Sequence, residues 1–203
     1  MKSLAIMCAG VLGACLVNAQ EFQRFTFDAG AGFSQPVGNT GRNLDVGWNA
    51  GAGAGMNFNQ YFGVMIQANY TDMGISSGTL ANIGVPGGDV SIWSFTLDPR
   101  VHLTPKGHFD LYLVGGGGWY RRNQEFTAPG TALVGDPFFG AFPIGVNQVL
   151  ASNSVNRPGF NVGAGMALGT KWHAKFFAEA RWNHMFLDNV HDDWIPVTFG
   201  VTF

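Results

Sequence analysis

The end of the chain alternates between apolar residues and small or polar residues with a period of two. Ile195, Val197, Phe199, Val201 and Phe203 fall on one face of an extended segment, and the residues between them are Pro, Thr, Gly and Thr. A period of two is that of a β-strand. Because a strand of an ordinary sheet does not expose five large apolar side chains to water, this face is expected to meet either a packed layer or lipid.

Segments with the same alternation recur through the chain. One face of each is apolar, and the other is built largely from Gly, Asn, Thr and Ser. The segments are 25–34, 46–58, 62–71, 93–103, 109–121, 160–169, 176–186 and 195–203. In a soluble sandwich or lipocalin the apolar faces would turn inward, and these glycine-rich faces would make a poorly hydrated exterior. The pattern favours an all-β fold, an eight-stranded antiparallel transmembrane β-barrel with up-and-down meander topology.

The first residues predict export. Lys2 precedes a mainly apolar run, and Val17-Asn18-Ala19 places small or compact residues where a signal peptidase reads them. We therefore expect a signal peptide over residues 1–19 and an outer-membrane β-barrel domain over residues 20–203. The apolar run is shorter than the ~20 residues that a membrane-spanning helix needs. An alternative is cleavage before Cys15, which would become a lipidated first residue.

The rest of the chain is poor in charge. Charged residues make up 12% of the sequence, about half the share that is usual in a soluble domain. Lys2 is the only charged residue of the predicted signal peptide, so its removal moves the formal net charge from -2 to -3. This balance does not indicate a nucleic-acid partner.

The predicted connections alternate in length. The short ones are 59–60, 104–108 and 170–174, and the longer ones are 35–45, 73–89, 123–158 and 187–193. Outer-membrane barrels keep short turns on the periplasmic side and longer loops outside, so both termini are expected in the periplasm. The loop 123–158 is rich in Gly, Pro, Phe and Val, a composition that suits surface contact or folding over the barrel mouth.

Aromatic residues gather near the predicted strand ends. Together they are expected to form two girdles at the membrane interfaces, although any one Trp could instead pack inside the protein. The girdle assignment covers Trp48, Tyr70, Trp93, Trp119, Trp172, Trp182 and Trp194.

Three sequence stretches carry a family resemblance: the ending V-T-F-G-V-T-F, the strand G-A-G-A-G-M and the segment F-F-A-E-A-R-W. With the eight strands, they resemble the small outer-membrane β-barrel family typified by the OmpA transmembrane domain and OmpX. The resemblance implies a monomer in the cell outer membrane, surrounded by membrane lipid and lipopolysaccharide. In that family the barrel-assembly machinery recognises the last strand, which implies Phe199, Val201 and Phe203 as the assembly signal here.

The interior of such a barrel is the place to look for a site, because eight strands enclose just enough space for their own side chains. The inward charged residues are expected to be Asp28, Asp98, Arg100, His102, Glu179 and Arg181. Comparable depth predicts pairing of Arg100 with Glu179 and of Asp98 with Arg181. Such pairs would neutralise buried charge and hold opposite walls together. A gated ion path or a catalytic acid and base is the alternative interpretation.

The histidines are scattered and do not indicate a site. A metal site at His191, Asp192 and Asp193 is not expected, because adjacent residues of a loop rarely converge on one ion, and no cofactor is expected. A lipid A deacylase would resemble the chain only at residues 181–184, and Phe186 replaces its serine. We predict a non-enzymatic, porin-like barrel with a structural or surface-interaction role through loops whose partner is unknown. A lipid-modifying enzyme and a narrow channel are the alternatives.

Overall fold

The computed structural model describes most of the chain after its first residues. The described residues are 24–105, 109–136, 140–169, 174–187 and 191–203. The predicted signal peptide, 1–19 with Cys15, and the predicted girdle residue Trp172 lie outside them. Within the described residues, no helix has the length and apolar character to cross a membrane.

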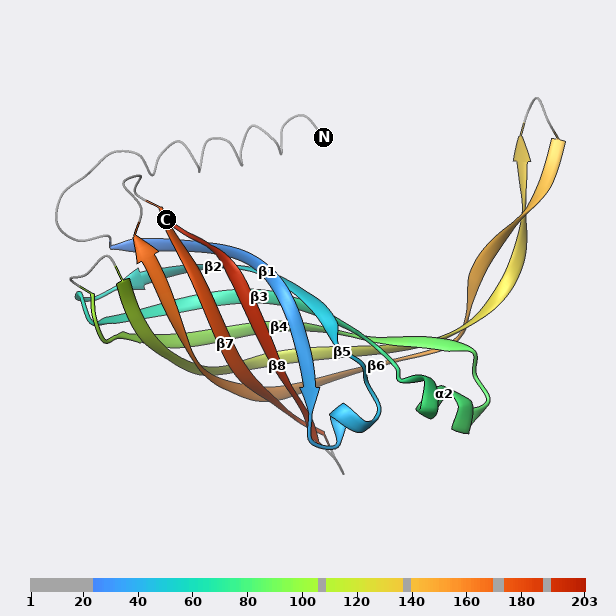
Figure 1. Cartoon of the computed structure of the whole chain (residues 1–203), viewed down its shortest axis with the longest axis horizontal. Coiled ribbons are helices and arrows are strands. Elements are labelled where there is room, and N and C mark those ends of the chain that lie inside the picture. Colours follow the sequence, from blue (N-terminus) through green and yellow to red (C-terminus); the bar gives the residue numbers. More distant parts are fainter. Residues whose placement is uncertain (1–23, 106–108, 137–139, 170–173, 188–190) are drawn as a thin grey trace.

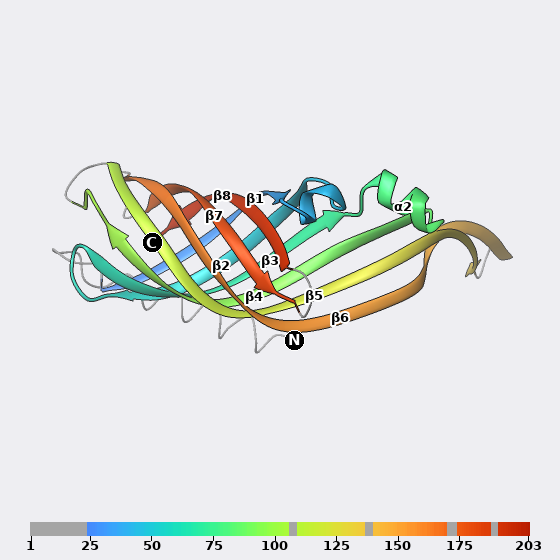
Figure 2. The same cartoon turned by 90° about the horizontal axis from the view of Figure 1, so that it is seen from below.

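Eight antiparallel strands form a closed barrel in sequence order (Figures 1 and 2). The strands are β1 (Phe25–Val37), β2 (Gly47–Asn57), β3 (Phe62–Gly74), β4 (Gly87–His102), β5 (Phe109–Asp136), β6 (Gly140–Gly169), β7 (Lys175–Phe186) and β8 (His191–Thr202). β8 pairs with β1 from Asp28↔Thr202 to Val37↔Asp193, which closes the ring. The predicted eight-stranded antiparallel meander is confirmed.

The alternation in the sequence becomes an apolar outer face and a polar inner face. On β4, Phe95 and Leu97 point outward and are each 54% exposed, whereas Thr96 and Asp98 point inward and are 4% and 0% exposed. A water-soluble barrel would have the opposite arrangement. The outer surface is therefore suited to hydrocarbon and the lumen to polar side chains.

The last strand follows the same rule. Phe199 and Phe203 lie on the outer face of β8 and are about half exposed, with Val201 between them on the same face. The side chains of the proposed assembly signal are thus presented together on the outside of the barrel. Their recognition by the assembly machinery stays a prediction.

The largest departure from the sequence-based expectation is the connection between β5 and β6. The expected loop 123–158 is wrong: the two strands stay paired from Trp119↔Pro158 to Asp136↔Gly140, with one register shift at Phe126/Thr127. They form a two-stranded ribbon that extends beyond the other strands and bends away from them (Figure 1). We call residues 128–148 the ribbon.

Prolines and glycines made this segment look like a loop. In the structure β4 pairs with β5 only as far as Thr127, and β7 pairs with β6 only from Gly159. The outer edges of the ribbon are therefore unpaired, and a proline on an open edge removes no ladder hydrogen bond. Pro129, opposite Asn147 in the ladder, lies in this two-stranded part.

The other long connections are also more ordered than expected. A 3-10 helix, η2 (Thr40–Arg42), follows β1, and an α-helix, α2 (Ser77–Ile83), follows β3. α2 ends at Gly84, whose φ of 70° lies in the left-handed region that suits glycine at a helix C-terminus. The expected loop 187–193 is shorter, because β8 already begins at His191.

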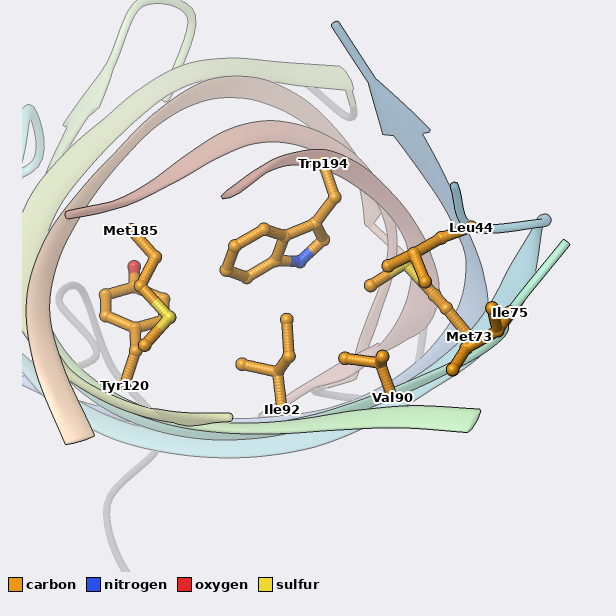
Figure 3. Close-up of a cluster of buried hydrophobic side chains, with 8 residues drawn as sticks. All are labelled: Leu44, Met73, Ile75, Val90, Ile92, Tyr120, Met185 and Trp194. Carbon is orange, nitrogen blue, oxygen red and sulfur yellow. The ribbon is translucent and has the colours of Figure 1, made fainter. Parts of the chain in front are cut away.

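Buried apolar side chains gather inside the barrel at the end that carries the long connections, which we call the loop end. Figure 3 shows these side chains pointing into the ring of strands from several sides. We call this cluster the apolar cap; it consists of Leu44, Met73, Ile75, Val90, Ile92, Tyr120, Met185 and Trp194. The Tyr120 and Trp194 rings meet edge to face, with centroids 5.7 Å apart. Aromatic contact of this kind adds to the stabilisation from burial.

The assignment of Trp194 to an outer girdle is wrong. Its side chain is 1% exposed and lies inside the cap. Trp194 shares its β8 face with Pro196 and Thr198, so the alternation itself turns it inward, even though it lies near a strand end. Tyr70 and the tryptophans that do face outward, Trp48, Trp93, Trp119 and Trp182, lie toward the loop end. Their place at a membrane interface remains a prediction.

Replacing Trp194 with Ala should be costly, because it removes a large side chain from the centre of the cap. We expect a loss of about 3–5 kcal/mol in the free energy of unfolding. The comparison is Trp119→Ala, which removes a side chain that is 53% exposed and should cost less than half as much. Urea unfolding of the detergent-refolded barrel, followed by the loss of its heat-modifiable gel band, measures both. Equal midpoints for the two variants would contradict this packing.

Candidate functional site

Three strands bring five charged side chains to one level of the lumen. Asp28 comes from β1, Asp98 and Arg100 from β4, and Glu179 and Arg181 from β7. Residues two apart on a strand share a face, so each pair on β4 and β7 points inward together. All five residues are between 0% and 7% exposed. We call them the lumen charge network.

The structure brings together both pairs that the sequence suggested. Arg181 Nη1 lies 2.7 Å from Asp98 Oδ2, and Arg100 Nη2 lies 3.5 Å from Glu179 Oε2. Two further contacts link these pairs into one network. Arg100 Nη2 donates to Asp28 Oδ2 at 2.8 Å, and Arg181 Nε donates to Glu179 Oε1. The network therefore ties β1, β4 and β7 together across the lumen.

Several neighbours that the sequence did not single out complete the network. Asp98 accepts hydrogen bonds from Thr96 Oγ1 at 2.7 Å and from Asn161 Nδ2 at 2.8 Å. The Arg100 guanidinium lies over the Tyr112 ring, 4.6 Å from its centroid. Tyr112 was hard to identify because β5 carries apolar side chains on both faces. Thr96 and Asn161 lie on polar strand faces, and only the structure shows that both donate hydrogen bonds to Asp98.

His102 belongs to a different pair. Its Nδ1 lies 2.5 Å from Asp110 Oδ2, and its ring lies against Tyr112. Both residues are nearer to the end of the barrel that carries the chain termini, which we call the terminal end. The inward direction expected for His102 is right, and its partner is an aspartate that the sequence did not indicate.

The lumen is layered along the barrel axis. At the terminal end lie the His102–Asp110 pair and a small buried cluster of Tyr112, Ala167 and Phe177. The lumen charge network follows, and the apolar cap lies at the loop end. A cavity of about 40 Å³ lies between network and cap, with Glu179 and Trp194 among its lining residues. At roughly 10–15 Å³ for each water position, it has room for about three waters.

The outer face near the loop end carries a second polar cluster. Asp193 Oδ1 lies 2.7 Å from His184 Nδ1, and Asp193 Oδ2 lies 3.3 Å from His191 Nε2. Asp192 points the other way and pairs with Arg122 at 2.8 Å. The expectation that residues 191–193 form a surface loop is therefore wrong, because all three belong to β8. Among the described residues, no group of three or more His, Cys, Asp or Glu side chains is arranged to hold a metal ion.

A closed eight-stranded ring with an apolar exterior, a polar lumen and short turns at the terminal end is the architecture of an integral outer-membrane β-barrel. The sequence agrees: residues 6–203 match the family described as outer membrane protein beta-barrel domain, and the chain belongs to that family. Membership supports a location in the outer membrane.

Solved structures of small outer-membrane barrels have the same fold. Neisserial surface protein A is 14% identical, with 90% of this chain and 98% of that chain covered and a TM-score of 0.59. OprG from Pseudomonas aeruginosa is 12% identical, with 92% and 99% covered and a TM-score of 0.53. Ail, the attachment invasion locus protein of Yersinia pestis, in complex with the heparin analogue sucrose octasulfate, is 20% identical, with 89% and 100% covered and a TM-score of 0.52. A comparison with curated proteins finds no match.

The charge balance of the network predicts which substitution harms it most. Arg181→Met leaves Asp98 and Glu179 without their shared guanidinium partner, and breaking a buried ion pair in this way costs about 3–5 kcal/mol. Glu179→Gln should cost less, because it leaves Asp28 with Arg100 and Asp98 with Arg181.

The control for Arg181→Met is Arg121→Met, since Arg121 is exposed on the outer face. This change should alter the free energy of unfolding by no more than about 0.5 kcal/mol. Urea midpoints of the refolded proteins compare the three variants. If Arg181→Met unfolds at the same urea concentration as Arg121→Met, the network does not stabilise the barrel.

Proposed function

We propose that this protein is a surface-interaction barrel of the outer membrane. The barrel anchors it in the membrane, and the ribbon carries the contact with an external partner. The observation that carries the proposal is the reach of β5 and β6, which have 28 and 30 residues where the other strands have 11 to 16. Strands that only span a membrane need about 9–11 residues.

The base of the ribbon has the chemistry of a contact surface. The stretch 145–156 contains no charged residue. Val149 and Leu150 are 56% and 58% exposed. They lie beyond Gly159, where the pairing of β6 with β7 ends, and Val149 stands opposite Thr127, the last β5 residue that pairs with β4. Unpaired strand edges and exposed apolar side chains are features that partners use for strand pairing and for burial.

The layered lumen supports a structural role in preference to transport. The apolar cap, the lumen charge network and the cluster around Tyr112 follow one another along the axis, and each is made of nearly fully buried side chains. An eight-stranded barrel has little interior space beyond its side chains. We propose that the lumen is filled and does not conduct ions.

The similar structures are compatible with this proposal. Ail carries the name of an attachment protein and was crystallised with a heparin analogue, so a small barrel of this fold can serve at the cell surface. Membrane lipid and lipopolysaccharide would surround the outward aromatic residues, and the assembly machinery would recognise Phe203 and its outward neighbours on β8. An enzymatic role has less support, because Phe186 occupies the position where a deacylase of this type would have serine.

Removing the ribbon tests the proposed role. Replacing residues 129–147 with Asn-Gly joins Ala128 to Gln148, which already face each other in the ladder, through a two-residue hairpin turn. Cells of a Gram-negative host that display the wild-type protein should adhere to immobilised glycans and matrix proteins more than vector-only cells do. The shortened variant should lose most of this adhesion, although Val149 and Leu150 remain at the base of the ribbon.

Two controls accompany this experiment. The shortened variant must keep its heat-modifiable band, which shows that the barrel is intact. A second variant, Val149→Ser with Leu150→Ser, removes the exposed apolar side chains and keeps the ribbon length, so it should lose part of the adhesion. Unchanged adhesion of the shortened variant would reject the ribbon as the contact element.

Conductance tests the filled lumen. The purified barrel, inserted into a planar lipid bilayer in 1 M KCl, should give no stable single-channel steps, because a lumen filled by the cap and the network would leave no continuous water path. A detergent-only control accounts for leak events. Reproducible steps of one amplitude that depend on the protein would support the narrow channel instead.

A further inference from the structure

The lumen charge network has one surplus negative charge. Asp28, Asp98 and Glu179 supply three carboxylates, and Arg100 and Arg181 supply two guanidiniums, all of them nearly fully buried. A buried charge without compensation is costly in a protein interior, and more so in one surrounded by lipid. A group of charge +1 at this level of the barrel would balance these five side chains.

Two buried oxygen atoms next to the network are available to hold it. Asp28 Oδ1 and Gln67 Oε1 accept no hydrogen bond from any residue that the structure describes. The two groups are adjacent, because Gln67 Nε2 donates to Asp28 Oδ2 at 3.4 Å. Asp28 and Gln67 are 5% and 7% exposed, and both line the cavity between network and cap. A buried oxygen without a donor is usually satisfied by a bound water, a cation or a proton. Water carries no charge, so the surplus charge beside these oxygens favours a cation or a proton.

Glycines of β2 make the space in which these groups lie. Gly53 stands opposite both Asp28 and Gln67 in the strand ladder. A Cβ at Gly53 would lie 2.7 Å from Gln67 Cγ, and one at Gly51 would lie 1.9 Å from Asn69 Oδ1. The amide side chains of Gln67 and Asn69 therefore lie directly over the glycines, and both residues line the cavity.

We propose that this cavity binds one small monovalent cation of the sodium type. The Asp28 carboxylate supplies the charge, and the amide oxygens of Gln67 and Asn69 complete the ligand set with water. Hard cations prefer such oxygen ligands. A single charge matches the surplus of the network, whereas a divalent ion would leave it overcompensated. The inference concerns the lumen alone and does not depend on the proposed surface role.

A proton is the competing occupant. Protonated Asp28 could donate from Oδ1 to Gln67 Oε1 and satisfy both atoms. That arrangement would remove the charge that binds Arg100 at 2.8 Å. Sodium satisfies the same two oxygens and keeps this ion pair, and the experiment separates the two occupants.

The test is the stability of the detergent-refolded wild-type barrel in sodium chloride against N-methylglucamine chloride at one ionic strength. Enough urea is present to bring thermal unfolding into range, and the heat-modifiable band reports it. At a sodium concentration ten times Kd, the midpoint should rise by about 3–6 °C over the bulky cation. N-methylglucamine is too large for the cavity, so its chloride salt shows the effect of ionic strength without binding in the cavity.

Three variants test which residues are responsible for the response to sodium. Asp28→Asn removes the surplus charge and the charged ligand, and should abolish the response to sodium. Gln67→Leu keeps the charge and removes a neutral ligand, so it should at least halve the shift and remains informative if Asp28→Asn does not refold. Asp45→Asn makes the same chemical change at an exposed position and should keep the full response.

Three results would overturn the proposal. The first is a wild-type midpoint that is the same in sodium and in N-methylglucamine. The second is a sodium response that persists in both Asp28→Asn and Gln67→Leu. The third is a midpoint that changes with pH and not with sodium, which would identify a proton as the occupant.

Discussion

Closure of the backbone hydrogen-bond ladder is the constraint on which the rest of this structure depends. In hydrocarbon no water is present to satisfy a free N–H or C=O, so a sheet can span a membrane only as a ring without edges. Pairing of β8 with β1 meets this requirement. The ring of eight strands then sets the radius, and the radius leaves little interior space beyond the side chains themselves. Packing inside the lumen follows from that narrowness.

A narrow polar lumen in a membrane has to satisfy each buried charge internally. The network does so by crossing the lumen: Arg181 contacts Asp98 from β4 as well as Glu179 from its own strand. Inward glycines on β2 are the counterpart of these long side chains, because the interior has no room for a side chain at every position. The apolar cap around Trp194 then covers this polar interior at the loop end.

The ribbon escapes the closure requirement because it extends beyond the ring of strands. Its edges are open past Thr127 and before Gly159. Water or a partner can satisfy the free backbone N–H and C=O groups of these edges, whereas hydrocarbon cannot. The same two strands therefore serve two environments, a closed ladder where lipid surrounds them and an open one outside.

The sequence by itself determined the number of barrel strands and the face on which each residue lies, because a period of two leaves only two directions for a side chain. The inward direction of Asp98, Arg100, Glu179 and Arg181 could be predicted for that reason. Which inward groups meet across the lumen depends on the stagger of strands that are not neighbours, and only the tertiary structure decided it. Trp194 combines both: the alternation of β8 already places its side chain on the inward face, and only the tertiary structure shows that it packs against Tyr120 in the apolar cap.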